Sequence, residues 1–210
     1  MSPRAPRSRF YDGPFYARLI DPFVSGLHRI VAELVTPGSR ILDVGCGTGN
    51  LVFRLAPAAS EVVGVELSPA MAEYAIRKLD ESASNVSIVL GDVTDVFKER
   101  PTGYFDAATM VLALHEMPTE ARAPVLHEVT RVAQKLLCLD YRVPMPWNLQ
   151  GVRNRIAEGL AGVEHFRSYR DFARRGGTQA IAEAAGLVYE NVRYPDRGSF
   201  DVAVITASGR

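Results

Sequence analysis

The stretch Ile41-Leu42-Asp43-Val44-Gly45-Cys46-Gly47-Thr48-Gly49 has the composition of a ligand-binding turn. Its apolar residues suit a buried parallel strand, which is apolar on both faces. The alternating glycines allow positive φ and let a ligand lie against bare backbone. A helix predicted from Leu51 onward points its free N–H groups at the same place. The pattern therefore predicts a strand, a turn and a helix that together bind a ligand.

Two acids follow at the ends of later apolar runs. Glu66 lies 17 residues after Gly49, and Asp92 follows the run from Val86 to Leu90. In a nucleotide site built from a strand–helix–strand unit, an acid at the end of the second strand accepts hydrogen bonds from ribose hydroxyls. Glu66 could instead be a solvated acid at a strand end, and Asp92 could cap a turn.

His115 is the candidate for proton transfer. It follows a fourth apolar run, and a neutral imidazole can accept a proton from a hydroxyl or a carbon acid because its pKa lies close to working pH. The same histidine could instead orient a substrate or cap the next turn. Glu116 is a weaker candidate, and Tyr141 and His165 are weaker still. We expect no metal ion.

The motifs resemble those of the class I S-adenosylmethionine (SAM)-dependent methyltransferases. The resemblance covers roughly residues 38–142 and rests on the run from Leu42 to Gly49, on Glu66, on Gly91-Asp92 and on Phe105-Asp106. It implies a Rossmann-like fold, S-adenosyl-L-methionine as cofactor with S-adenosyl-L-homocysteine as product, and in-line methyl transfer to a small-molecule acceptor. His115 would then lie where the methyl group faces its acceptor.

The resemblance also implies a role for each cofactor-binding residue. Asp43 would accept a hydrogen bond from the cofactor's amino group, Glu66 from the ribose, and Asp92 from the adenine amino group. Leu67 and Val93 would make apolar contacts. The full expected set is Asp43, Gly45, Cys46, Gly47, Gly49, Glu66, Leu67, Asp92 and Val93. Asp106 would lie at the opposite edge of the sheet, so we interpret it as structural.

The composition is that of an ordinary globular protein. The chain has 210 residues, of which 47% are hydrophobic and 23% charged, and a formal net charge of zero gives no global attraction to nucleic acid or membrane. There are two cysteines and no apolar run long enough to span a bilayer. The leader Met1–Arg9 lacks a signal-peptide core. We therefore expect a cytoplasmic protein that uses no membrane, and the zero net charge speaks against a nucleic-acid partner.

Strands alternate with helices along most of the chain. Apolar runs predict strands at about 40–45, 61–66, 86–90, 104–112 and 136–141, and a final pair at 187–192 and 200–206. Helices are predicted at about 14–20 and 22–35, with Asp21 as N-cap, near Thr119, and over 177–185. The fold class is α/β, a doubly wound, mostly parallel seven-stranded sheet with helices on both faces and an antiparallel C-terminal edge.

We expect one methyltransferase domain over residues 1–210. Residues 1–35 form a leader and helices over the cleft, 36–142 the cofactor-binding core, 143–175 a cap over the acceptor pocket, and 176–210 a C-terminal helix and hairpin strands. Residues 142–175 could instead form a surface helical pair with solvated arginines. Tyr11 and Tyr16 could line the cleft or pack at a domain edge.

Three other functions stay open. The first is an NAD-dependent oxidoreductase, although the glycine spacing and Asp92 speak against it. The second is a SAM-binding protein without catalysis, because a fold does not fix a function. The third is a methyltransferase whose acceptor is a protein or RNA, recognised through the arginine-rich segment.

Overall fold

The structure is a computed structural model that describes residues 18, 21–79, 84–149, 151–152 and 163–209. The strands are β1 (Arg40–Val44), β2 (Glu61–Glu66), β3 (Val86–Leu90), β4 (Ala107–Val111), β5 (Leu136–Tyr141), β6 (Leu187–Arg193) and β7 (Phe200–Ala207). The helices are α2 (Asp21–Glu33), α3 (Asn50–Leu55), α4 (Pro69–Arg77), α5 (Val93–Val96), α6 (Thr119–Val132), α8 (Val163–Arg174), α9 (Gly177–Ala184) and α10 (Pro195–Gly198), with a 3₁₀ turn η2 (Ala56–Ala58).

The strands form one seven-stranded sheet in the order β3-β2-β1-β4-β5-β7-β6. β1 to β5 run parallel to one another, whereas β7 pairs antiparallel with both β5 and β6. The sheet order reverses between β1 and β4, which lie side by side. Ligands of such sheets bind at this switch point, beyond the carboxyl ends of the strands. The predicted fold class is confirmed.

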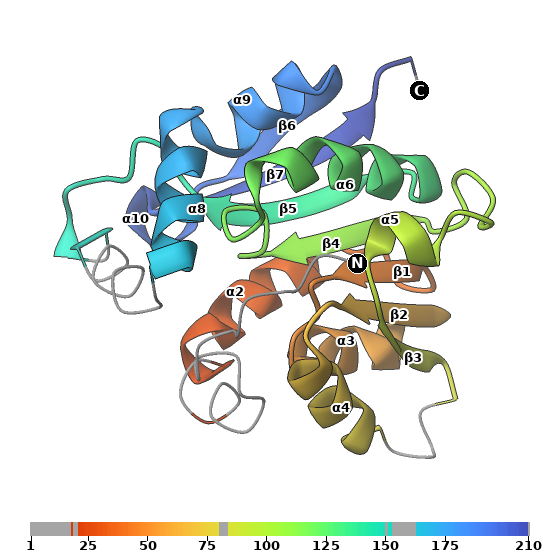
Figure 1. Ribbon diagram of the computed structural model, residues 1–210. Helices are drawn as coiled ribbons and strands as arrows, with labels where there is room; N and C mark the ends of the chain where they lie inside the picture. The colour runs from red at the N-terminus through yellow and green to blue at the C-terminus, as the bar shows by residue number, and fades with distance from the viewer. Residues whose placement is uncertain (1–17, 19–20, 80–83, 150, 153–162, 210) are drawn as a thin grey trace.

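Helices cover both faces of the sheet (Figure 1). α2 packs against α3, and α3 and α4 contact β2, whereas α5, α6 and α9 follow one another in contact on the other side. α8 contacts α6 and α9 and lies on the side toward which the arrowheads of β4 and β5 point. Within the described residues, no helix combines the length and apolar composition needed to cross a membrane.

The central strands form the core. All residues of β5 are buried, and so are four of the five residues of β1 and four of the five residues of β4. Most of these side chains are apolar, as expected for parallel strands covered on both faces. Two acids interrupt the pattern: Asp43 on β1 and Asp140 on β5 are both buried. Both lie near the carboxyl end of a strand, where ligands of this fold class bind.

One predicted boundary is wrong, and another differs by one residue. α2 begins at Asp21, one residue before the predicted start, and the Asp21 carboxylate accepts a hydrogen bond from the Thr48 hydroxyl at 2.6 Å. β4 spans 107–111, not 104–112. The Asp106 carboxylate accepts from the Arg40 N–H at 2.8 Å, and Leu112 has φ of +53°, which a strand does not allow. The contact of Asp106 supports its structural interpretation.

The remaining predicted helices and strands differ in their outcome. α6 begins at Thr119 and runs through Pro124, as the sequence allows. The helix predicted at 177–185 is α9, and the C-terminal strand pair is β6 and β7. Apart from Arg18, the helix predicted at 14–20 lies outside the described residues, and so do Tyr11 and Tyr16.

Candidate functional site

The three glycines of the turn after β1 all have positive φ, from 56° to 79°, but for different reasons. A Cβ on Gly49 would lie 2.7 Å from the Phe53 ring, so this glycine lets α3 pack. A Cβ on Gly45 would lie 3.1 Å from the Cβ of Ala113, which follows β4. A Cβ on Gly47 would meet nothing within 4 Å. Gly47 therefore presents bare backbone to open space, which suits close approach of a ligand.

The N–H groups of this turn are already bonded within the protein. Gly45 and Cys46 both donate to the Val65 carbonyl, at 2.8 and 3.1 Å, and Gly47 donates to the Glu66 carboxylate at 3.0 Å. A pyrophosphate needs such donors and avoids a neighbouring carboxylate. The turn is therefore unsuited to the pyrophosphate of NAD, and it suits a ligand that carries no phosphate.

Glu66 joins the turn to the next helix. It is buried at the end of β2, where Oε2 accepts from Gly47 and Oε1 accepts from the Ser68 N–H at 2.6 Å. Leu67 lies half-buried between Glu66 and Ser68. Because two backbone donors from different segments hold it, the carboxylate has a fixed position at the carboxyl end of β2. This is where the sequence predicts a ribose contact.

Asp43 is buried on β1 and accepts from the Thr109 hydroxyl of β4 at 2.7 Å. Burial raises the pKa of its carboxyl to about 7, the hydrogen bond from Thr109 opposes this shift, and the negative charge of Glu66 adds to it. Two acids therefore lie close together in a dry environment. A ligand that carries positive charge would stabilise the ionised form of Asp43.

The remaining predicted cofactor residues make contacts within the protein. Asp92 is the N-cap of α5, and its Oδ1 accepts from the N–H and the hydroxyl of Thr94 at 2.9 and 2.7 Å. The capping role weighed from the sequence is thus present, and an adenine contact stays a prediction. Val93 is buried in the core. Cys46 is buried as well: a Cβ on Gly64 would lie 2.8 Å from its sulfur, and burial raises the pKa of its thiol.

His115 lies on the loop after β4 and is held by one acid. Its Nδ1 lies 2.7 Å from Oδ1 of Asp140, and its backbone N–H donates to Oδ2 at 3.1 Å. The Tyr141 N–H also donates to Asp140, at 2.7 Å. Both His115 and Asp140 are buried, with 2% and 0% of the side chain exposed. The imidazole therefore has one orientation, and Nδ1 carries the proton that Asp140 accepts.

Aromatic rings surround His115. The Tyr141 ring centroid lies 4.8 Å away, and those of His165, Phe172 and Tyr169 on α8 lie at 5.5, 6.2 and 6.3 Å. His165 also approaches Glu116, with 3.8 Å between Nδ1 and Oε1. The structure thus brings together His115, Glu116, Tyr141 and His165, which the sequence names separately as candidates.

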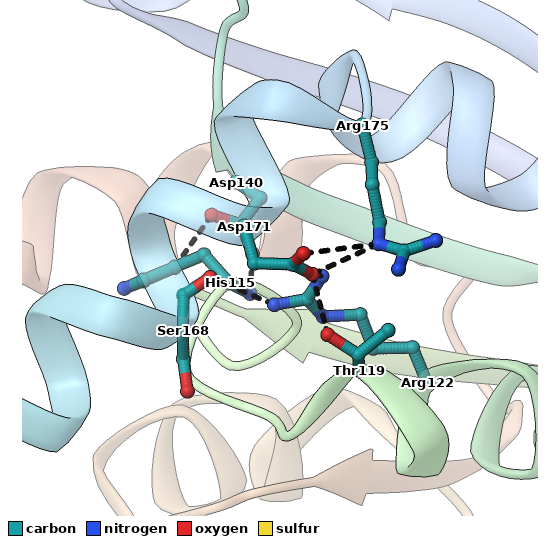
Figure 2. A network of polar contacts seen from close by, with 7 residues as sticks. All are labelled: His115, Thr119, Arg122, Asp140, Ser168, Asp171 and Arg175. Carbon is teal, nitrogen blue, oxygen red and sulfur yellow. Dashed lines mark hydrogen bonds and ion pairs between the residues drawn. The ribbon is translucent and has the colours of Figure 1, made fainter.

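A polar network holds α8 against α6 (Figure 2). The buried Arg122 of α6 donates to the Asp171 carboxylate and to the Ser168 carbonyl, both at 2.8 Å. Thr119 and Arg175 donate to the same carboxylate. The bond from Thr119 contributes most to a lowered pKa of Asp171. The network fixes the helix that carries His165 and the aromatic rings.

Comparison with known proteins gives the family. The sequence profile described as "Methyltransferase domain" matches residues 41–135. A ubiquinone biosynthesis O-methyltransferase of Xanthomonas campestris pv. campestris is 35% identical over 92 residues, which are 44% of this chain and 38% of that protein. A 2-phytyl-1,4-naphtoquinone methyltransferase of Nostoc sp. is 30% identical over an alignment of 174 positions, which covers 73% of this chain and 75% of that protein. This chain belongs to the class I SAM-dependent methyltransferases.

The fold agrees with this family. A SAM-dependent methyltransferase from Aquifex aeolicus has a similar structure, with a TM-score of 0.60, 20% identity, and coverage of 93% of this chain and 95% of that chain. SAM is the cofactor of the family, and the turn fits it, since SAM offers a cation, a diol and no phosphate. The match to the Xanthomonas methyltransferase spans less than two-fifths of that protein's length.

Several residues that position the site are not predicted from the sequence. Asp140 and Thr109 are polar residues in strands that are otherwise mostly apolar, and a buried acid within an apolar strand is a usable signal because burying a charge needs compensation. Arg122 and Asp171 carry no such signal. They lie 49 residues apart on two helices, and each looks like a surface residue in its own helical pattern.

Proposed function

We propose that this protein transfers the methyl group of SAM to a small-molecule acceptor by in-line displacement. The observation that supports this best is the juxtaposition along one edge of the sheet. An acidic site with bare backbone, at Gly47 and Glu66, lies at the ends of β1 and β2, and a histidine enclosed by aromatic rings lies at the ends of β4 and β5. The two parts are adjacent, since a Cβ placed on Gly45 would lie 3.1 Å from the Cβ of Ala113, two residues before His115.

On the cofactor side, acids that are already held in place would bind the ligand. Glu66 accepts from the ribose hydroxyls, Asp92 from adenine, and the backbone at Gly47 allows the cofactor to approach. Asp43 accepts from the cofactor's amino group, directly or through water. The bound cofactor supplies an activated methyl group on a positively charged sulfur. The positive charge of the ligand also offsets the cost of ionising the buried Asp43.

His115 is the catalytic residue that we assign on the acceptor side. Asp140 holds the proton on Nδ1, so Nε2 carries the lone pair that can accept a proton from the acceptor's hydroxyl or thiol. Asp140 acts through His115 and is a positioning residue. Most catalysis in such a displacement comes from alignment of donor and acceptor, where the gain can reach about 7–11 kcal/mol. The rings of Tyr141 and Tyr169 favour an acceptor with an apolar, aromatic face.

The domain organisation and the setting belong to the same proposal. We infer one methyltransferase domain, in which α8 covers the acceptor, and a cytoplasmic setting; residues 150 and 153–162 of the predicted cap at 143–175 lie outside the described residues. Contacts of α8 with α6 and α9 support the first inference. Free, buried Cys46 and Cys138 support the second.

The test is a titration followed by a turnover screen. Calorimetry with SAM and S-adenosylhomocysteine measures cofactor binding, and release of S-adenosylhomocysteine measures turnover with phenols, hydroquinones and thiols. The relatives named above as quinone methyltransferases support this choice of acceptors. Saturable SAM binding with turnover of one acceptor class is expected. Binding without turnover of any small molecule, or turnover of RNA or protein alone, would overturn the acceptor class.

A further inference from the structure

We propose that His115, Glu116 and His165 form a binding site for one divalent transition-metal ion. The first two lie on the loop after β4, and His165 comes from α8. One ligand atom from each, two imidazole nitrogens and one carboxylate oxygen, can be chosen so that all three lie within 4.8 Å of one another. The site lies at the acceptor end, so its consequence for catalysis rests on the proposed function, whereas metal binding itself does not.

Coordination requires the ligand atoms to move closer together, because they lie within 4.8 Å of one another and a tetrahedral ion needs shorter separations. Zinc binds nitrogen and oxygen ligands at about 2.0–2.2 Å, which places tetrahedral ligand atoms about 3.4 Å apart. The Nδ1 of His165 and Oε1 of Glu116 are 3.8 Å apart. Glu116 is partly exposed, with 29% of its side chain accessible, so a rotation of this side chain can close the gap.

Asp140 prepares His115 for this role. A histidine that binds a metal through one ring nitrogen usually donates the other N–H to a carboxylate or a carbonyl, which fixes the tautomer and raises the basicity of the ligand atom. Nδ1 of His115 makes such a contact with Asp140 at 2.7 Å. Nε2 is then the nitrogen that binds the ion. Asp140 is itself held by two backbone N–H groups, those of His115 and Tyr141.

The position of His165 is also fixed. Arg122 bonds to the Ser168 carbonyl and the Asp171 carboxylate, one to two turns further along α8 (Figure 2). The two imidazole rings are almost perpendicular, at 85°, with centroids 5.5 Å apart. A rigid helix therefore carries one ligand and a rigid loop carries the other. Preorganisation of this kind separates a built site from two histidines that happen to be close.

The donor set indicates the kind of ion. Two imidazoles and one carboxylate suit Zn²⁺, Co²⁺, Mn²⁺ or Fe²⁺, whereas Mg²⁺ and Ca²⁺ prefer oxygen ligands alone. Three protein ligands leave a position open for a further ligand. An acceptor oxygen or sulfur bound there has a lowered pKa and needs no imidazole base. With the metal bound, the acceptor would release its proton to solvent, and His115 would act as a ligand and not as a base; the base role of His115 belongs to the metal-free protein.

The experiment measures metal binding directly. Full-length protein is stripped with a chelator, titrated with Zn²⁺ in competition with a chromogenic chelator, and assayed for bound zinc by mass spectrometry after gel filtration. Co²⁺ serves as a second probe, because its visible absorption reports nitrogen and oxygen ligands. We expect one Zn²⁺ per chain, a Co²⁺ spectrum, and no competition from millimolar Mg²⁺.

Variants separate the site from ordinary surface binding. His165→Ala and Glu116→Gln should each weaken Zn²⁺ binding by more than about tenfold, because losing even a supporting contact costs about 10- to 100-fold. His127→Ala, on the exposed face of α6, is the matched control and should bind as the wild type does. Circular dichroism and SAM titration check that each variant folds.

The outcomes are distinct. Wild type without stoichiometric zinc, or with zinc affinity unchanged in both Glu116→Gln and His165→Ala, overturns the metal site and leaves a half-buried His165–Glu116 pair in its place. If SAM binds but zinc does not, the proposed function stands and the metal site fails. If zinc binds but SAM does not, the metal site stands and the proposed function fails.

Discussion

At the ends of β1 and β2, backbone groups set the geometry of the site, whereas at the ends of β4 and β5 side chains do. Gly45, Cys46 and Gly47 donate N–H groups to β2, and Glu66 receives one of them. On the other side, His115 and Asp140 meet through side-chain atoms. A backbone-built site tolerates many substitutions outside its turn, while a side-chain-built site changes with each residue.

The difference suits the two tasks. The first region handles one ligand common to a whole family, so a fixed turn with a few acids is sufficient. The second must match one acceptor, and it draws residues from the loop after β4, from β5 and from α8. If the two regions are as separate as this, substitutions on one side should change turnover and those on the other should change cofactor affinity.

The largest expected effect is on the acceptor side. His115→Ala should lower kcat by about 10²- to 10⁴-fold, the usual contribution of a positioned acid or base, while the Kd for SAM stays within about twofold. Release of S-adenosylhomocysteine gives kcat, and calorimetry gives the Kd. His127→Ala is the control. A parallel loss of SAM affinity in His115→Ala would break the separation between the two regions.

Glu66→Ala tests the cofactor side. It removes contacts to the ribose and also the acceptor for the Gly47 and Ser68 N–H groups. Hydrogen bonds to a charged group contribute about 1.5–3 kcal/mol each, so SAM affinity should fall at least 10- to 100-fold. Glu73→Ala, on the exposed face of α4, should leave it unchanged. Calorimetric titration measures both, and equal affinities in the two variants would refute the assignment of Glu66.

The same contrast explains what the sequence could predict. The turn at Gly45–Gly49 and the acid Glu66 belong to one strand–helix–strand unit, in which both lie at the carboxyl ends of neighbouring parallel strands, so this pattern indicates that they meet. His115 and Asp140 are 25 residues apart, and Arg122 and Asp171 are 49 apart. No local pattern joins them, because their contact depends on how β5 and α8 pack. The fold class follows from alternating apolar runs, whereas the details at Asp21 and Leu112 depend on tertiary contacts and backbone φ.

Asp171→Asn tests how α8 supports the acceptor side. The substitution removes the charge that Arg122, Thr119 and Arg175 share. Asp171 is about one-third exposed, so solvent screens part of the effect, and we expect a loss of about 1–2 kcal/mol in the free energy of unfolding by urea. Hydrogen exchange should rise in α8 more than in α3, and kcat should fall without a change in SAM affinity.

Asp95→Asn is the matched control for that substitution. Asp95 pairs with Lys98 at an exposed position on the protein surface. It should show no measurable change in unfolding midpoint. Equal exchange in α3 and α8 after Asp171→Asn would mean that the network serves global stability and not the placement of α8.

The smallest effect is a pH dependence of SAM binding through Asp43. Its folded pKa is raised to about 7 by burial, so the carboxyl is mostly neutral below that pH and must lose a proton before it can pair with a cation. SAM affinity should therefore rise as pH rises, by at most about tenfold per unit below pH 7, and level off above it.

The stability of the ligand-free protein should change with pH in the opposite direction. The folded state holds more protons than the unfolded state between about pH 4 and 7, so the free energy of unfolding falls as pH rises across that range. Asp43→Asn should remove both slopes, and Glu73→Gln should keep them. A slope that survives in Asp43→Asn would assign the titration to another group and leave Asp43 as a partner of Thr109 alone.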